Sequence, residues 1–143
     1  MEKFKGIYER WIDIWNGDLG LIAEVVSPRF VGHWPPVRPD VPYDVVGPAR
    51  LRRMVEMSRT LIPDLRVSVE AGPIAEGAVL AARWVGRGRY AGGIRGATAP
   101  PGTEVAFCGC DFLRIESDRI VEYWVSSDGL SLLAQVGALP GQE

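Results

Sequence analysis

The sequence has few of the residues that build metal sites and covalent active sites. Among 143 residues there is one histidine, His33, and there are two cysteines, Cys108 and Cys110. A metal site needs more ligands than these, so we expect none. The two cysteines lie two apart in a predicted strand, where parallel side chains are poorly placed for a disulfide, and we expect buried free thiols.

A large excess of one charge and a long apolar run are also missing. The formal net charge is −2, which gives no broad basic field to support a nucleic-acid partner. No apolar run reaches the roughly 18 residues that a membrane span needs, and residues 1–5 lack the apolar core of a signal peptide. The glycines of residues 86–93 do not follow a nucleotide-binding spacing. We therefore expect a cytoplasmic protein without a nucleic-acid or membrane partner.

What the sequence does contain is an ordinary globular composition, with 47% hydrophobic and 24% charged residues, which favours one domain over residues 1–143. Apolar residues recur at helical spacing over 3–15, and a second helix is predicted from Asp18 to Val26. A third helix begins at Pro48, a residue that suits the first turn of a helix. Its predicted inward face consists of Leu51, Met54, Val55, Ser58 and Leu61.

The predicted strands follow a different period. Residues 30–34 form a short strand, and the four prolines of 35–47 predict an irregular segment of the kind used as a lid or binding loop. Further along the chain the apolar residues alternate with polar ones. This pattern predicts a long strand over 78–90 and a hairpin made of 105–115 and 119–126.

The order of the elements, three helices and then a meander of antiparallel strands, indicates an α+β fold. A strongly twisted sheet of this kind can curl around the helices into a cone. A cavity then forms between the helices and the sheet, and we expect a ligand to bind there.

Asp128 is the first candidate catalytic residue. It ends a strand rich in aromatic and β-branched residues and precedes a short apolar helix predicted over 129–136. A carboxyl group at the floor of an apolar pocket loses water, which raises its pKa and makes it a usable base. The alternative is that Asp128 only caps the helix, a role that favours the charged carboxylate.

Asp111 is the second candidate, because it interrupts an apolar run where an unpaired buried polar group would be costly. If the two strands of the last hairpin pair in regular register, Asp111 lies opposite Trp124, and Asp128 lies opposite Phe107. These four residues and Glu122 then share one face, and we expect the two acids to flank a substrate from two sides. The alternative is that Asp111 lies on the outer face and pairs with an arginine.

Histidine and arginine side chains supply further candidates. His33 follows the first strand and precedes the proline-rich segment, next to Trp34, which makes it a candidate acid or donor; a lone histidine is also commonly structural. Arg83 and Arg87 lie on one face of the predicted long strand. They could pair with Asp111 or bind a substrate oxygen, and solvent exposure is an equal alternative.

An ordered set of residues resembles the SnoaL-like polyketide cyclase family of the NTF2-like superfamily over nearly the full length. The resemblance implies an α+β cone with three N-terminal helices packed on a curved, mainly antiparallel sheet. Sheets of this superfamily commonly pair through their outer faces, so it also implies a homodimer. The matching residues are Asn16-Gly17-Asp18, Phe30-Val31-Gly32-His33, Gly47-Pro48, Pro63-Asp64-Leu65, Glu76-Gly77, Arg83-Trp84, Pro101-Gly102-Thr103, Asp111, Arg114, Ile120, Glu122, Trp124, Asp128, Gln135 and Gly137.

The activity that the resemblance implies is aldol-type ring closure of an apolar, oxygenated, polyketide-like substrate by acid–base chemistry, with no cofactor. The family's aspartate base matches Asp128, and its partner histidine falls at Asp111, where a protonated carboxyl can serve as the acid. His33 is the other candidate acid. The expected substrate contacts are Trp34, Arg83, Phe107, Glu122 and Trp124.

Two alternative functions stay open at this level. Because a carboxyl replaces the family's histidine at Asp111, the predicted site resembles the two-carboxylate site of limonene-epoxide-hydrolase-like enzymes. The Arg-x-Asp triplet expected in those enzymes is absent. In such a two-carboxylate site Asp111 and Asp128 activate a water that opens an epoxide. The other alternative is a non-catalytic ligand-binding module with an apolar pocket, in which Asp128 is only a helix cap.

Overall fold

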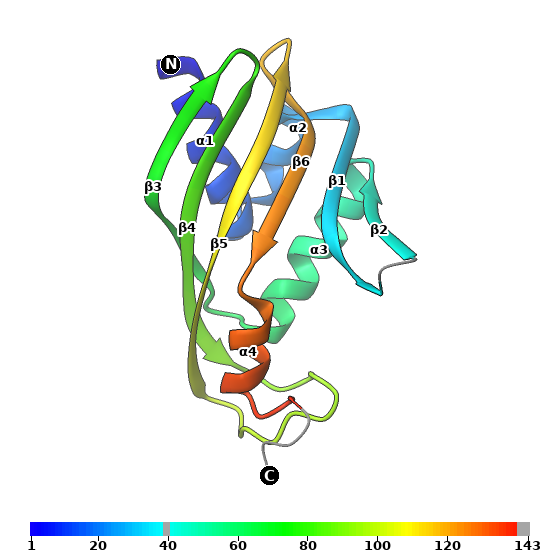
Figure 1. The fold of residues 1–143 in the computed structure, drawn as a ribbon, viewed down its shortest axis with the longest axis vertical. Helices are drawn as coiled ribbons and strands as arrows, with labels where there is room; N and C mark the ends of the chain where they lie inside the picture. The colour runs from blue at the N-terminus through cyan, green and yellow to red at the C-terminus, as the bar shows by residue number, and fades with distance from the viewer. Residues whose placement is uncertain (39–40, 140–143) are drawn as a thin grey trace.

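A computed structural model of the protein describes residues 1–38 and 41–139, and Figure 1 follows the chain from its N-terminus to its C-terminus. The helices are α1 (Glu2–Trp15), the 3₁₀ turn η1 (Leu19–Leu21), α2 (Ile22–Val25), α3 (Pro48–Leu61) and α4 (Gly129–Gln135). The strands are β1 (Val26–Arg38), β2 (Val41–Val46), β3 (Arg66–Glu76), β4 (Val79–Tyr90), β5 (Thr103–Glu116) and β6 (Arg119–Ser127).

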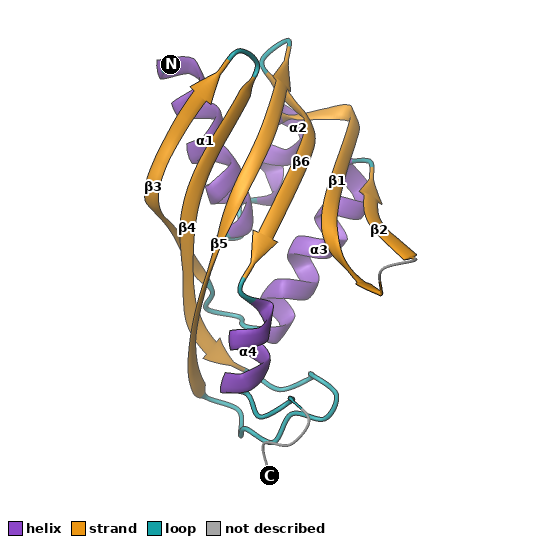
Figure 2. Ribbon diagram, in the orientation of Figure 1, coloured by secondary structure: helices purple, strands orange, loops and turns teal. Residues whose placement is uncertain are grey.

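These strands form one curved sheet in the order β2-β1-β6-β5-β4-β3. Neighbouring strands are antiparallel, apart from β1 and β6, which run parallel. Figure 2 shows α1, α2 and α3 against one face of the sheet, the inner face, and α4 near the end of β6. The opposite face is called the outer face below. The prediction of N-terminal helices packed on a curved, mainly antiparallel sheet is confirmed.

The helices bury the faces that their sequence periodicity predicts. In α1, Trp11 is completely buried in the core. The predicted inward face of α3 is divided between two roles: Leu51 and Val55 are buried, whereas Met54 and Leu61 line a pocket. No helix within the described residues is both long enough and apolar enough to cross a membrane.

The proline-rich segment is not the irregular loop that its prolines predict. β1 continues to Arg38 and pairs with β2, which is an edge strand. The pairing is interrupted between Trp34 and Arg38, where two of the prolines lie. Because proline lacks the N–H of a ladder hydrogen bond, a sheet edge with irregular register tolerates it. The prediction of a loop over 35–47 is therefore wrong for the described residues, and residues 39–40 lie outside them.

A bulge in β6 changes which residues face each other in the last hairpin. Ile115 pairs with Ile120, but the next pair joins Arg114 to Glu122, so Val121 is left between them. Ile120 and Val121 are both buried, which the regular alternation of a strand does not allow. An extra residue of this kind shifts the register of everything that follows it.

The shift moves the predicted partners by one residue. Trp124 lies opposite Phe112, and both are on the outer face. Asp111 and Phe107 lie on the inner face, where they line the pocket next to the helices. The prediction that Asp111 and Phe107 share a face with Glu122 and Trp124 is wrong, because sequence alone does not reveal the bulge.

Candidate active site

An apolar cavity of about 200 Å³ lies between the helices and the inner face of the sheet. Aromatic rings form much of its wall. Trp34 meets Tyr123 edge to face, with 5.2 Å between ring centroids, and Trp84 meets Phe107 in the same way at 5.7 Å. Two predicted substrate contacts, Trp34 and Phe107, therefore lie in the pocket wall.

Asp111 is the only charged side chain among the described residues that line this cavity. It is 1% exposed. Its Oδ2 accepts a hydrogen bond from the Tyr8 hydroxyl at 2.9 Å, and its Oδ1 accepts from Trp84 Nε1 at 2.9 Å and from the Tyr123 hydroxyl at 2.8 Å. The inward orientation predicted for Asp111 is confirmed, and the alternative of an outward carboxylate paired with an arginine is wrong.

Burial is the largest influence on the pKa of Asp111 and raises it to about 6, although the hydrogen bonds from Tyr123, Trp84 and Tyr8 favour the charged form. A carboxyl group with this pKa is mostly ionised at neutral pH, and it can both accept and release a proton there. Burial and the nearby Asp111 charge raise the pKa of Tyr8 and of Tyr123, so both phenols remain protonated donors.

Trp11 adds a fourth donor beside this carboxylate. Its buried Nε1 has no hydrogen-bond partner among the described residues, yet it lies close enough to Asp111 to favour the charged form. Its ring packs on Tyr123 with 4.7 Å between centroids. The carboxylate of Asp111 is thus surrounded by neutral donors from α1, β4 and β6, and no cationic side chain within the described part of the chain pairs with it.

The sequence pattern does not identify these donors as part of a site. It assigns Tyr8 to the core and gives no role to Tyr123 or Trp84, because their contact with Asp111 depends on the convergence of three elements. One signal could have found them. A buried carboxylate requires hydrogen-bond donors, and tyrosine and tryptophan are the residues that bring a donor into an apolar core.

Asp128 does not lie at the floor of the cavity. It is exposed and caps α4, with its Oδ1 accepting a hydrogen bond from the backbone N–H of Ser131 at 3.4 Å. The sheet ends at Ser127, which still lines the cavity, and the chain turns away one residue later. The prediction that Asp128 is buried in an apolar pocket is wrong, and the capping alternative describes its position.

His33, Glu122 and Trp124 come together on the outer face and not in the cavity. The ring nitrogens of His33 contact Asp44 at 3.0 Å and Glu122 at 2.7 Å, and its ring stacks on Trp124 with 5.5 Å between centroids. Within the described ranges, no three or more histidine, cysteine, aspartate or glutamate side chains are arranged to hold a metal.

Arg83 also lies on the outer face. It forms an ion pair with Glu70 at 3.3 Å and donates a hydrogen bond to Cys108 Sγ at 3.1 Å, so it does not pair with Asp111. Cys108 is half-buried and Cys110 is exposed, and both thiols are free. The prediction of free thiols on one face is confirmed, but the prediction that they are buried is wrong.

The fold and the cavity together define the class of protein. An α+β chain in which N-terminal helices and a curved sheet enclose an apolar pocket has the NTF2-like architecture. Over residues 5–136 the sequence matches the profile of the SnoaL-like polyketide cyclases, and the chain belongs to that family. Family membership supports a cyclase-type function on this fold.

Solved structures agree with this assignment. The candidate polyketide cyclase IdmH from Streptomyces antibioticus is 26% identical, with a TM-score of 0.78 over 93% of this chain and 97% of that chain. The candidate hydroxylase AclR from Streptomyces galilaeus is 26% identical, with a TM-score of 0.78 over 97% of this chain and 83% of that chain. A candidate SnoaL-like cyclase from Jannaschia, 19% identical with a TM-score of 0.80 over 97% and 94% of the two chains, supports the fold alone. No curated protein matches the sequence.

Proposed function

We propose that this protein is an acid–base catalyst of the cyclase type, in which Asp111 removes a proton from a carbon next to a carbonyl group. The substrate is apolar, oxygenated and polyketide-like, and it binds in the cavity between helices and sheet. One observation carries the proposal: the cavity is lined mainly by aromatic and aliphatic side chains, and the buried carboxylate of Asp111 is the single charged group among the described residues that line it.

The donors around Asp111 fit both halves of an aldol-type reaction. The carboxylate takes a proton from the substrate carbon, and the resulting enolate attacks a second carbonyl of the same molecule to form a carbon–carbon bond. Asp111 then returns its proton to the new alkoxide, so no atom is gained or lost. While Asp111 is protonated, the hydroxyl of Tyr123, which lines the cavity, can rotate its O–H toward the enolate oxygen, and the fixed N–H of Trp84 stays on Asp111 Oδ1.

The proposal keeps some of the sequence-based site and leaves other parts out. Trp34 and Phe107 stay as contacts for the substrate ring system. Asp128 becomes a helix cap. Epoxide opening by two carboxyl groups has little support, because Asp128 is exposed and does not line the cavity with Asp111.

The experiment is hydrogen–deuterium exchange at the α-carbon of 2-tetralone, a bicyclic ketone small enough for the cavity. Exchange into D₂O, followed by NMR, measures proton abstraction directly, without knowledge of the natural substrate. Wild-type protein should accelerate it, and Asp111→Asn should lower the accelerated rate by at least about 100-fold, the usual contribution of a general base. The wild-type second-order rate constant should rise with pH through about 6.

Asp128→Asn is the matched control, since it makes the same chemical change at an exposed carboxyl group. It should leave exchange within a few-fold of wild type. If instead Asp128→Asn abolishes exchange and Asp111→Asn does not, the base is Asp128 and the proposal is wrong.

The second candidate function is a non-catalytic ligand-binding module, and one observation favours it. Asp111 already accepts three hydrogen bonds from protein donors, which is the arrangement of a purely structural carboxylate. Quenching of tryptophan fluorescence by 2-tetralone, with no acceleration of exchange at any pH, would support this binding module over the enzyme.

A further inference from the structure

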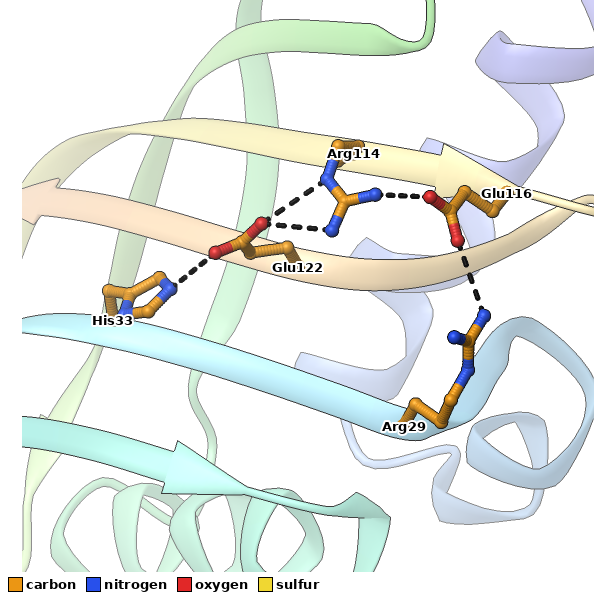
Figure 3. A network of polar contacts seen from close by, with 5 residues as sticks. All are labelled: Arg29, His33, Arg114, Glu116 and Glu122. Carbon is orange, nitrogen blue, oxygen red and sulfur yellow. Dashed lines mark hydrogen bonds and ion pairs between the residues drawn. The ribbon is translucent and has the colours of Figure 1, made fainter.

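The outer face carries a chain of charged side chains that joins β1, β5 and β6 (Figure 3) and extends to Asp44 on β2. His33 on β1 lies between two carboxylates, with Nδ1 at 3.0 Å from Asp44 Oδ1 on β2 and Nε2 at 2.7 Å from Glu122 Oε2 on β6. Both carboxylates only accept hydrogen bonds when ionised, so both ring nitrogens of His33 must carry hydrogen to satisfy them. The geometry is therefore that of an imidazolium held between two anions.

The network continues from Glu122 across the sheet and returns to β1. Arg114 on β5 donates to Glu122 Oε1 through Nε at 3.2 Å and through Nη2 at 3.0 Å. Arg114 also contacts Glu116, whose other oxygen accepts from Arg29 Nη2 at 3.3 Å. The chain of contacts thus begins at His33 and ends at Arg29, both on β1 (Figure 3).

This network spans an irregular part of the sheet's backbone ladder. β1 and β6 pair at Val26 and then again only from Val31 to His33, with an irregular register between. β2 is attached to the rest of the sheet through β1 alone. Side-chain contacts from His33 therefore hold an edge that backbone hydrogen bonds hold only in part.

The same edge forms part of the cavity wall on the opposite face. Trp34 follows His33 directly, points to the inner face and packs against Tyr123. A Cβ built at Gly32 would come within 2.5 Å of the Trp34 ring, so this ring lies directly over the backbone of β1. A displacement of β1 at His33 would therefore displace the Trp34 wall.

We propose that His33 is a protonation-dependent clamp, which ties the β1–β2 edge to β6 in its imidazolium form and so fixes Trp34 in the cavity wall. Loss of the proton leaves one nitrogen without hydrogen, facing a carboxylate, and releases the edge. The clamp concerns the cavity wall and not proton transfer at Asp111. Only its effect on substrate binding rests on the proposed function, so the two can fail separately.

The charged groups around His33 act in the required direction. Burial lowers its pKa, but hydrogen bonds from the ring to Glu122 and Asp44 outweigh burial and raise the pKa above its ordinary value. The nearest cation of the network, Arg114, contacts Glu122 and not His33, and it is neutralised by Glu122 and Glu116. The clamp is therefore closed below the raised pKa of His33 and opens as the pH rises through it.

The first test is an NMR titration, which is simple here because His33 is the only histidine of the chain. In tag-free protein a single imidazole signal should titrate above the ordinary pKa of 6.5. Asp44→Asn and Glu122→Gln should each lower the measured pKa, because each removes one anion. A wild-type pKa at or below 6.5 overturns the proposal, and this result needs no variant to fold.

The second test is amide hydrogen exchange, expressed as protection factors to remove the intrinsic effect of pH. Between about pH 6 and pH 9, protection of Val31–Trp34 and of the β2 amides should fall by about tenfold, as expected for the loss of one charge-assisted hydrogen bond, while β4 and β5 stay protected. His33→Gln should show the lower value at every pH. Asp118→Asn, which breaks the exposed Lys3–Asp118 pair, is the control and should behave as wild type.

Protection of this edge that does not change with pH in wild type, or that is equal in wild type and His33→Gln, overturns the clamp. If His33→Gln loses protection over the whole sheet, the wild-type titration and pH series still decide the question.

Discussion

At the scale of single residues, the unusual feature of this protein is a buried anion that no cationic side chain of residues 1–35 or 43–139 contacts. Asp111 keeps its charge only because Tyr8, Trp84 and Tyr123 donate to it. Neutral donors stabilise a carboxylate less than an arginine does, so the proton affinity stays high. This balance is what makes Asp111 suitable for proton transfer near neutral pH.

The pH dependence of stability provides a direct check on the state of Asp111. Its folded pKa, about 6, lies above the ordinary value of 3.8, so its contribution to stability is fully present below about pH 4 and is lost as the pH rises through 6. Two pKa units correspond to about 3 kcal/mol. The measurement is urea unfolding of both proteins. The unfolding free energy of wild type minus that of Asp111→Asn should decrease by this amount between about pH 4 and pH 7. A difference that is constant with pH contradicts the raised pKa.

The sequence predicts part of this site correctly. A polar residue in the apolar strand around Asp111 signals a buried site, and two of the expected substrate contacts, Trp34 and Phe107, do line the cavity. Asp128 is different, since the residue before a short helix reads equally well as a base or as a cap. Only the backbone direction after Ser127 decides between them, and that direction depends on tertiary packing.

At the scale of elements, the helices and long strands follow from periodicity, whereas the edges and bulges do not. The register of β6 depends on one extra residue at Val121, and two adjacent apolar residues, Ile120 and Val121, give no sign of which is extra. The sequence does not predict the β1–β2 hairpin, because the segment contains prolines, which the interior of a sheet excludes. Both errors concern places where a strand departs from regular pairing, which local sequence does not encode.

The closing helix α4 gives a prediction at this scale. A helix of seven residues is too short to be stable alone. The Gln135 side chain binds α4 to β5, because it accepts a hydrogen bond from Ala106 N at 2.9 Å and donates one to Ala106 O at 2.7 Å. Gln135→Ala should detach α4, with loss of amide protection over 129–136 and a decrease of about 1–2 kcal/mol in unfolding free energy.

The control for this prediction is Leu130→Ala on the same helix, because Leu130 is 71% exposed. It should leave both quantities close to wild type. Equal effects of the two substitutions would mean that the Gln135 side chain does not hold α4.

At the scale of the whole molecule, the two faces of the sheet have separate tasks. The inner face encloses the cavity, and the outer face carries the charged network and exposed aromatic rings. Phe112 and Trp124 lie opposite each other there, with 51% and 37% of their surfaces exposed. Large exposed rings that lie next to each other on one face of a sheet are typical of a surface that another protein covers.

The family resemblance implies a homodimer, and we predict that it forms through this outer-face surface around Phe112 and Trp124. Light scattering after size exclusion should give twice the mass of one chain for wild type. Phe112→Glu should give the mass of one chain with an unchanged circular dichroism spectrum, because a charge in the centre of a dry interface is costly. Leu130→Glu, at an exposed apolar residue outside the sheet, is the control. A monomeric wild type contradicts the prediction.

The parallel pairing of β1 with β6 also has a consequence for biosynthesis. As the ribosome extends the chain, residues 26–38 emerge roughly 80 residues before 119–127, their partner on one side, and translation at about 5–20 residues per second makes them wait for several seconds. During this interval the backbone groups of the nascent β1 that pair with β6 have no partner, and the cavity lacks the wall that β6 contributes. Folding is therefore completed only after the last strand leaves the exit tunnel, and truncated chains that stop before β6 should depend on chaperones to stay in solution.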